Sequence, residues 1–315
     1  MTRDAVGLVL GLIIGIQLTE YWNYNYLQTT ILERKSPKAG SQAVGLFNRT
    51  RVLCMVLTDP LDYDKNEAKV KSTWGRRCNK LFFWRKKKEN NTFATVRQGF
   101  KNIFEKHFNG HDWFLRADTD TFVIMENLRR FLYRYDPESS IYFGHRLKAD
   151  FAQGYMSGDA GYVLSRGALR RLNLFAFKDS NLCSHDLNSS LKSEDSGMGL
   201  CLNTVGVIAG ESRDGLGQER FLPVMPQRIG PGWTRWRQYS GSLYFNPTSR
   251  ACCSSSLISF HPANESAFDL WEFFLHRLSV FGYPMSPLKL PPRLDFRAMH
   301  AQLRYWSQVV SDNHG

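Results

Sequence analysis

The sequence predicts an α/β domain with a mainly parallel sheet. Short apolar runs typical of buried strands alternate with segments whose apolar residues recur at helical spacing. The 315 residues are enough for a sizeable core, and a composition of 43% apolar and 22% charged residues is that of a globular protein. Disorder and fibrous repeats are therefore excluded as the main state of the chain.

The N-terminal apolar run, Val6–Leu18, predicts a short signal-anchor. It is shorter than the about 20 residues that usually span a bilayer, but an aromatic segment, Tyr21–Tyr26, follows it like an interfacial belt. A cleaved signal peptide and a buried core helix are the alternatives. We assign the anchor, a stem and the folded domain to residues 1–26, 27–50 and 51–315.

The expected elements alternate along the folded domain. Buried strands are predicted at residues 51–58, 81–84, 113–117, 141–144 and 160–164. Helices are predicted at residues 67–74, 96–108, 128–135, 165–175 and 198–205. Ser165 is expected to cap the fourth of these helices, and a glycine-rich turn is expected at residues 154–158.

The six cysteines indicate disulfides rather than a zinc site. No CxxC pair occurs, and an even number of cysteines fits three bridges in an oxidising compartment. Asn-x-Ser/Thr triplets, which are glycosylation acceptors in secreted proteins, support this interpretation. They begin at Asn48, Asn90, Asn188 and Asn264.

The net charge of +12 favours an anionic partner. Nucleic acid, acidic lipid and a phosphorylated small molecule all fit a positive field. The basic residues are dispersed, and the apolar N-terminus and the cysteines point away from the nucleus. We therefore expect no nucleic-acid partner.

The segment Asp118-Thr119-Asp120 directly follows the predicted strand at residues 113–117. Ligands of open α/β sheets bind at the carboxyl ends of strands. Two carboxylates separated by one residue can reach a single hard cation there, such as Mg²⁺ or Mn²⁺. Such an ion can stabilise a diphosphate leaving group. A solvated turn is the alternative, and the preceding strand favours the metal site.

Three further features carry weaker signals. Glu194-Asp195 precedes a predicted helix, where the carboxylates either complement the helix dipole or supply a general base. His261 ends an apolar stretch and is either a structural histidine or an Mn²⁺ ligand. An aromatic cluster that includes Trp236 and Tyr239 can stack on sugar faces or pack into the core.

Six strings, taken in order, resemble a known family. They are TWGRRC from Thr73, WFLRADTDT from Trp113, GYMSG from Gly154, AGYVLS from Ala160, Glu194-Asp195, and Cys252-Cys253 followed by Ser259-Phe260-His261. Together they resemble the core 1 β1,3-galactosyltransferases of glycosyltransferase family 31, over residues 51–283. Each string alone is weak, whereas the ordered set is specific.

The resemblance implies a GT-A type (Rossmann-like) glycosyltransferase domain behind an N-terminal signal-anchor. It implies a single-pass type II protein of the Golgi membrane with a lumenal catalytic domain. The implied reaction is the inverting transfer of galactose from UDP-galactose to the 3-hydroxyl of GalNAc α-linked to Ser or Thr of glycoproteins. The implied cofactor is Mn²⁺, and a homodimer is left open.

Carried over residue by residue, the resemblance assigns roles to the site. Asp118 and Asp120 would hold the metal and the donor diphosphate, with His261 as a further metal ligand. Asp195 would be the base that deprotonates the acceptor hydroxyl. Trp236 and Tyr239, in the aromatic cluster, would line the acceptor site. The disulfides implied are Cys54–Cys78 and Cys183–Cys201, and the pairing of Cys252 and Cys253 stays open.

The chain departs from the family in three places. Thr119 stands in the middle of the metal motif, and Asp159 stands where the family has a second glycine after Met-Ser. The connection at residues 85–92 is shorter than in the family. This shortening favours an alternative function, a catalytically inactive chaperone or a glycan- or client-binding protein of the secretory pathway. The retained carboxylates and histidine favour the enzyme.

Overall fold

The structure is a computed structural model of the chain. It describes residues 17, 19, 41–58, 63–85, 92–149, 151–179, 183, 193–226, 242, 253–261, 265–278 and 290–312. Trp236, Tyr239, Cys252 and nearly all of the expected anchor lie outside these residues. Within the described part of the chain, no helix has both the length and the apolar character needed to cross a membrane.

A six-stranded sheet forms the centre of the fold, in the order β2-β1-β3-β8-β5-β9. The strands are β1 (Val52–Thr58), β2 (Lys80–Arg85), β3 (Trp113–Asp118), β5 (Ile141–Gly144), β8 (Tyr162–Ser165) and β9 (Ile208–Ala209). β1 runs parallel to β2 and β3, β5 runs parallel to β9, and β8 is antiparallel to both β3 and β5. Within this sheet only β8 is reversed, so the prediction of a mainly parallel sheet is confirmed.

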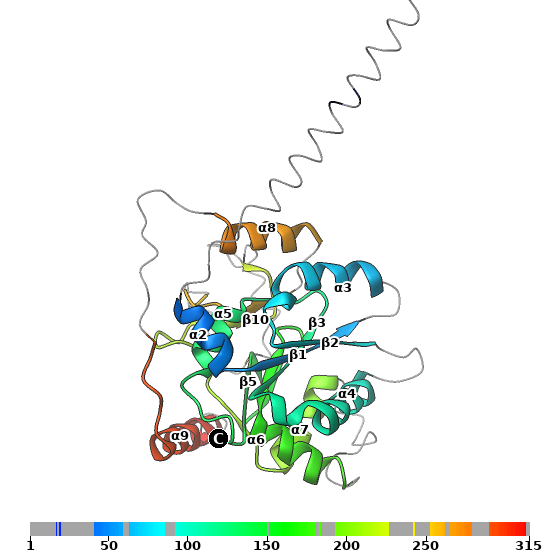
Figure 1. The fold of residues 1–315 in the computed structure, drawn as a ribbon. Coiled ribbons are helices and arrows are strands. Elements are labelled where there is room, and N and C mark those ends of the chain that lie inside the picture. Colours follow the sequence, from blue (N-terminus) through cyan, green and yellow to red (C-terminus); the bar gives the residue numbers. More distant parts are fainter. Residues whose placement is uncertain are drawn as a thin grey trace, which may run out of the picture.

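Helices cover both faces of the sheet (Figure 1). The α-helices are α2 (Ser41–Arg49), α3 (Tyr63–Ser72), α4 (Thr92–His107), α5 (Met125–Leu132), α6 (Arg166–Arg171), α7 (Glu194–Thr204), α8 (Glu265–His276) and α9 (Phe296–Asp312). Short 3-10 turns occur at Trp74–Arg77 (η1) and Phe108–Gly110 (η2), and a π-helical turn, η3, occurs at Leu172–Ala176.

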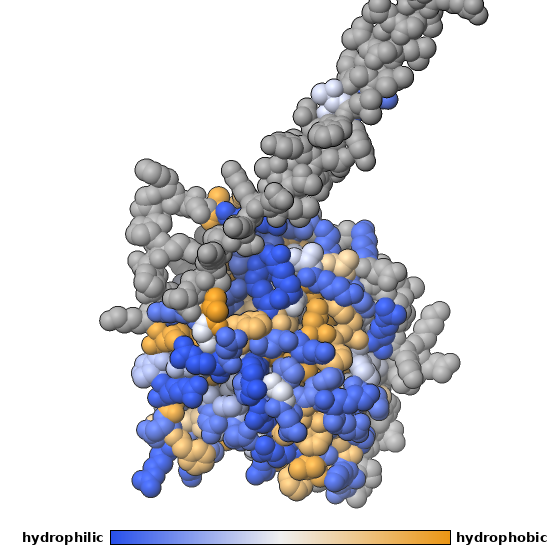
Figure 2. Space-filling view, viewed as in Figure 1, coloured by the Kyte–Doolittle hydropathy of each residue, from blue (hydrophilic) through white to orange (hydrophobic). Residues whose placement is uncertain are grey.

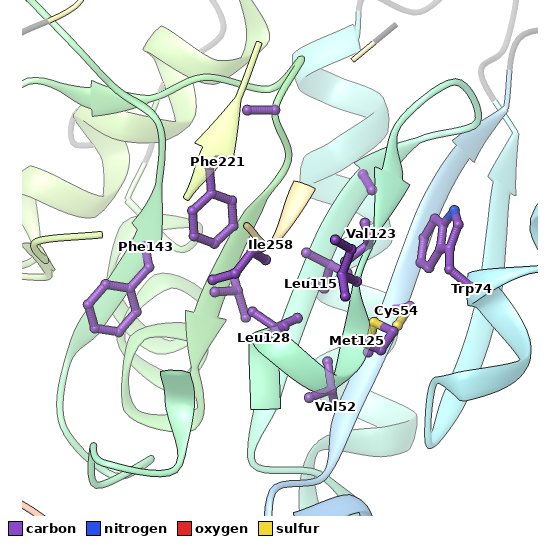
Figure 3. Packing of buried hydrophobic residues seen from close by; sticks show 14 of the residues in the cluster. Val52, Cys54, Trp74, Leu115, Val123, Met125, Leu128, Phe143, Phe221 and Ile258 are labelled. Atoms are coloured by element: carbon purple, nitrogen blue, oxygen red, sulfur yellow. The ribbon is translucent and has the colours of Figure 1, made fainter. Parts of the chain in front are cut away.

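The covering of both faces explains the continuous apolar run of β1, in which every residue is buried. Side chains alternate between two apolar clusters, as the pleat requires. Val52 and Cys54 belong to a cluster with α3, α5, α8 and α9, part of which is drawn in Figure 3. Leu53 and Met55 belong to a second cluster with α4, α6 and α7. The same strand therefore supplies side chains to the apolar clusters on both faces of the sheet.

The expected strands and helices are present with shifted ends. The helix expected at residues 165–175 is α6 followed by η3, and the Ser165 hydroxyl caps it by accepting a hydrogen bond from the Ala168 amide at 3.0 Å. The expected glycine-rich turn instead holds a strand, β7 (Tyr155–Met156), which pairs with β6 (Arg146–Leu147). Within the expected stem, α2 is helical, and its Leu46 is buried.

A small second sheet lies beside the end of β3. It consists of β10 (Phe221–Leu222), β11 (Ser259–Phe260) and β4 (Phe122–Val123), in that order. β11 runs parallel to β10 and antiparallel to β4, with Phe260 opposite Phe122. This pairing brings His261, the residue after β11, beside the turn that connects β3 to β4.

Two of the implied disulfides are present, Cys54–Cys78 and Cys183–Cys201. Cys253 is also disulfide-bonded. The first bridge ties β1 to the end of η1, and the second ties α7 to the segment after η3. Figure 2 shows a mainly hydrophilic face with apolar residues scattered over it.

Candidate active site

The candidate site lies at the edge of the main sheet where β1, β3 and β5 end. Asp118 is the last residue of β3. Because β8 is antiparallel, it begins at this same edge, with Tyr162 opposite both Arg116 of β3 and Gly144 of β5. The loop Gly158–Gly161, which leads into β8, therefore lies next to Asp118.

Asp118 has one carboxylate oxygen bound and one free. Its Oδ2 accepts a hydrogen bond from Arg116 Nη1 at 2.9 Å. Its Oδ1 is buried and has no hydrogen-bond partner among the residues that the structure describes. A buried carboxylate oxygen without a donor is costly, so this atom is suited to a ligand.

Asp120 and His261 lie beside each other at one end of the second sheet. His261 Nδ1 lies 3.3 Å from Asp120 Oδ1. The Asp120 side chain is 48% exposed, whereas that of His261 is only 17% exposed. Burial lowers the pKa of His261, but the Asp120 carboxylate outweighs this and raises the pKa overall. The His261 imidazole and the Asp120 carboxylate thus attract each other.

Asp195 lies in the first turn of α7, which begins after Ser193. The Ser193 hydroxyl caps the helix, and the acidic pair that follows is in the position that the helix dipole favours. Asp195 Oδ2 accepts a hydrogen bond from the Gly158 amide at 2.9 Å, and Oδ1 accepts one from the Ser196 amide at 3.0 Å. The carboxylate is therefore held by backbone groups and keeps lone pairs for a proton.

Glu194 is turned the other way, into the core. Its Oε2 accepts a hydrogen bond from Arg116 Nη2 at 2.8 Å, and its Oε1 accepts one from the Tyr162 hydroxyl at 2.8 Å. Burial raises the pKa of Glu194, and although the guanidinium of Arg116 lowers it, the pKa is raised overall. Burial alone would lower the pKa of Arg116, but Asp118 and Glu194 raise it, so Arg116 stays charged.

The loop between Gly158 and Gly161 is fixed from several sides. The Thr121 hydroxyl donates to the Asp159 carbonyl at 3.0 Å, and the Ser259 hydroxyl donates to the Ala160 carbonyl at 2.5 Å. Gly161 has a φ of 74°, which permits the turn into β8. Asp159 is exposed, but desolvation of its carboxyl raises the pKa of that group. His261 lowers this pKa, while repulsion from Asp118 and Asp195 raises it, and the pKa is raised overall.

Comparison with known proteins identifies the family. A family model described as Fringe-like matches residues 46–213. The chain is also 32% identical over 321 residues to glycoprotein-N-acetylgalactosamine 3-beta-galactosyltransferase 1 of Xenopus laevis, covering 88% of this chain and 86% of that protein. The chain belongs to the Fringe-like family. The resemblance to core 1 β1,3-galactosyltransferases is thereby confirmed.

Other similarities of this Fringe-like chain are weaker. It is 27% identical over 156 residues to a beta-1,3-glucosyltransferase of Mus musculus, a match to 44% of this chain and 30% of that protein. A glycosyltransferase involved in glycosylation of the PBCV-1 major capsid matches 45% of this chain and 71% of its own, with 15% identity and a TM-score of 0.30. The catalytic domain of Drosophila beta1,4-galactosyltransferase 7 matches 51% and 64%, with 14% identity and a TM-score of 0.29. Likeness at such TM-scores supports no assignment.

The structure brings together the site residues that the sequence suggested, as far as it describes them. His261 lies beside Asp120, while Asp118 and Asp195 are joined through Arg116 and the Gly158 peptide. Arg116 and Tyr162 were missed. The sequence did contain a signal for Arg116: it is a charged residue inside the apolar string Trp113–Ala117, and a buried charge needs a partner.

The site offers a divalent cation only part of its ligands. The described residues contain no group of three or more His, Cys, Asp or Glu side chains that could hold a metal by itself. Ions such as Mg²⁺ are commonly held by one or two carboxylates together with substrate phosphates. The free Oδ1 of Asp118 and the accessible Asp120 fit that pattern, with His261 adjacent. The residues thus fit a metal that binds together with a nucleotide diphosphate.

Proposed function

We propose that the chain transfers galactose, with inversion, from UDP-galactose to the 3-hydroxyl of GalNAc α-linked to Ser or Thr of glycoproteins. The observation that carries this proposal is the meeting of Asp118, Asp120 and Asp195 at one sheet edge in a chain of this family. A metal-binding pair and a separate carboxylate are what a nucleotide-sugar transfer to an alcohol needs. The site favours this enzyme over the inactive chaperone, which has no use for a free buried carboxylate oxygen.

In this proposal Asp118 and Asp120 would hold Mn²⁺, with His261 as a further ligand. When bound, the ion supplies positive charge that stabilises the UDP leaving group. Arg116 already forms ion pairs with Asp118 and Glu194. Its charge therefore neutralises these carboxylates and not the donor diphosphate directly. The diphosphate of the donor would supply the remaining oxygen ligands, so the protein needs to provide only these few groups.

Asp195 is the proposed general base. It takes the proton of the acceptor 3-hydroxyl while that oxygen forms a bond to the anomeric carbon of galactose. The bond from that carbon to the phosphate oxygen breaks on the opposite face, and its electron pair leaves with UDP. Attack from the face opposite the leaving group inverts the anomeric centre, by the same logic as in inverting glycoside hydrolysis.

The fold type and the location belong to the same proposal. The mixed sheet and the family membership support a GT-A type fold. The disulfides support an oxidising compartment, and the run Val6–Leu18 supports a signal-anchor in a type II protein of the Golgi membrane. The homodimer stays a prediction.

The direct test uses purified full-length protein, UDP-galactose labelled in the sugar, and a GalNAc-threonine peptide. We expect labelled product with Mn²⁺ and none with EDTA. Asp195→Asn should lower kcat by about 100-fold or more, because the base is lost. Asp269→Asn, a change at an exposed residue of α8, is the matched control and should act like the wild type.

The alternative makes a different prediction. A chaperone should bind an unfolded client polypeptide without nucleotide and show no Mn²⁺-dependent affinity for UDP in calorimetry. That pattern, together with the absence of metal-dependent product, would contradict the enzyme.

A further inference from the structure

Arg116 is a charged residue in the interior of the molecule. It lies in β3 between buried apolar neighbours, and its side chain is only 4% exposed. Its guanidinium lies 5.8 Å from the centre of the Tyr162 ring on the next strand. Burying a charge in this way requires compensation from specific partners.

The partners of Arg116 come from three separate elements that all form the site. Nη1 donates to Asp118 Oδ2 at 2.9 Å and to the Gly158 carbonyl at 2.7 Å. Nη2 donates to Glu194 Oε2 at 2.8 Å. One side chain therefore connects the end of β3, the loop before β8 and the start of α7.

The Gly158 peptide extends this connection to Asp195. Its carbonyl accepts from Arg116, and its amide donates to Asp195 Oδ2. Glu194, bound to Arg116, is the residue directly before Asp195 on α7. Two routes thus lead from the guanidinium to Asp195, one through the helix backbone and one through the loop.

We propose that Arg116 is a positioning residue that fixes the position of Asp118 relative to Asp195, and that Glu194 is its partner on α7. This inference rests on the proposed function. By occupying Asp118 Oδ2, Arg116 leaves Oδ1 as the oxygen available to the metal. By holding Glu194 and Gly158, it fixes where Asp195 stands relative to that oxygen.

The geometry requires arginine. A guanidinium presents donors in a rigid planar fork, whereas a lysine ammonium is a single point on a flexible stem. Lysine at this position keeps the charge but cannot hold Asp118 and Glu194 at once in the same directions. Outer partners that orient metal ligands typically change metal affinity or activity by about 10- to 100-fold when they are altered.

The experiment compares Arg116→Lys and Glu194→Gln with a matched control, Arg166→Lys. Arg166 is likewise bound to two carboxylates and a carbonyl, but where β3 begins: Asp112 Oδ1 at 2.9 Å, Glu138 Oε1 at 3.2 Å and the His111 carbonyl at 2.8 Å. The readouts are the Mn²⁺ dissociation constant in the presence of UDP, measured by calorimetry, the kcat of galactose transfer, and the melting temperature.

The two test variants should give different signatures. Arg116→Lys cannot keep the contacts to Asp118 and Glu194 together, so it should weaken Mn²⁺ binding and lower kcat, each by about 10-fold or more. Glu194→Gln weakens only the contact between Arg116 and α7, so kcat should fall while the Mn²⁺ dissociation constant stays within about twofold of the wild type. Arg166→Lys should lower the melting temperature without changing Mn²⁺ affinity. A purely structural role for Arg116 would not separate metal affinity from kcat in this way.

The inference is overturned if folded Arg116→Lys binds Mn²⁺ and UDP like the wild type. Should Arg116→Lys fail to fold, Glu194→Gln decides alone, and a wild-type kcat, or an equal loss of Mn²⁺ affinity and kcat, overturns the inference. Failure of the proposed function looks different, because wild-type protein itself would then neither transfer galactose nor bind Mn²⁺ with UDP.

Discussion

At the scale of single residues, Gly158 leaves little room for a side chain. A Cβ at this position would lie 3.1 Å from Arg116 Nη1 and 3.3 Å from Glu194 Oε2. Both of these groups are buried and hydrogen-bonded, so neither can withdraw cheaply. The glycine thus lets the loop peptide approach the ion pair closely enough to bond with Arg116 on one side and Asp195 on the other.

We expect Gly158→Ala to lower galactose transfer by about 10-fold and to reduce the free energy of unfolding by about 1–3 kcal/mol through overpacking. Urea unfolding and an activity assay check both effects. Gly110→Ala is the matched control, because its Cβ would meet nothing within 4 Å, and it should leave both quantities near wild type. A Gly158→Ala protein with wild-type kcat would show that the loop can move without harm to Asp195.

Single residues also mark how far the sequence could predict the site. Asp118 and Asp120 could be placed because they follow an apolar strand, and the end of a strand is a defined location. The residue pattern alone could not place His261 beside Asp120, since their contact depends on the pairing of β11 with β4; only the family resemblance assigned both to one metal site. Glu194 was left open between capping and base, and its actual partner, Arg116, is 78 residues away in the chain.

At the scale of elements, the apolar runs predicted the strands but not all of their directions. β8 is buried throughout, like its neighbours, and a buried strand has the same pattern whichever way it runs. Its reversal follows from the pairing with β3 and β5. β7 was hidden because its two residues stand in a glycine-rich string, where local pattern favours a turn.

The Cys183–Cys201 bridge belongs to this scale, because it anchors α7, the helix that begins with Glu194-Asp195. It closes a loop with a sequence separation of 18 residues, and both cysteines are buried. The double variant Cys183→Ala/Cys201→Ala should lose about 3 kcal/mol of unfolding free energy, measured by denaturant unfolding. Transfer should fall as well, since the start of α7 carries the base.

The comparison is reduction of the protein, which removes Cys54–Cys78, Cys183–Cys201 and the disulfide of Cys253 at once. Cys54–Cys78 ties β1 to η1 rather than to α7. If the double variant has the same free energy of unfolding as the wild type, α7 is held by packing alone.

At the scale of the whole molecule, α8 is bound to a part of the chain nearly 200 residues earlier. Glu272 accepts two hydrogen bonds from Arg77, at 2.9 and 2.7 Å, across a sequence separation of 195 residues. His276, one turn later, lies 3.4 Å from Glu272 and 3.5 Å from Glu126 of α5. This cluster joins η1, α5 and α8 on the face of the sheet that carries the first apolar cluster.

The cluster predicts how stability depends on pH. Burial alone would raise the pKa of Glu272, but hydrogen bonds from His276 and Arg77 outweigh this and lower it from 4.5 to about 2. A carboxyl whose pKa is lower in the folded state stabilises that state fully above its unfolded pKa and loses the contribution as pH falls toward the folded pKa. The stabilisation by Glu272 should therefore be complete at neutral pH and decline below about pH 4.5.

Glu272→Gln should accordingly reduce the free energy of unfolding at pH 7 by about 2 kcal/mol, because it replaces hydrogen bonds between charged groups. Urea unfolding between pH 7 and pH 3 should show the difference from wild type narrowing below about pH 4.5. Asp269→Asn on the same helix is the control: its ion pair with Lys69 is exposed, so it should change stability by less than about 1 kcal/mol at any pH in this range. A difference that stayed constant down to pH 3 would mean that Glu272 acts through packing and that its charge does not join α8 to η1.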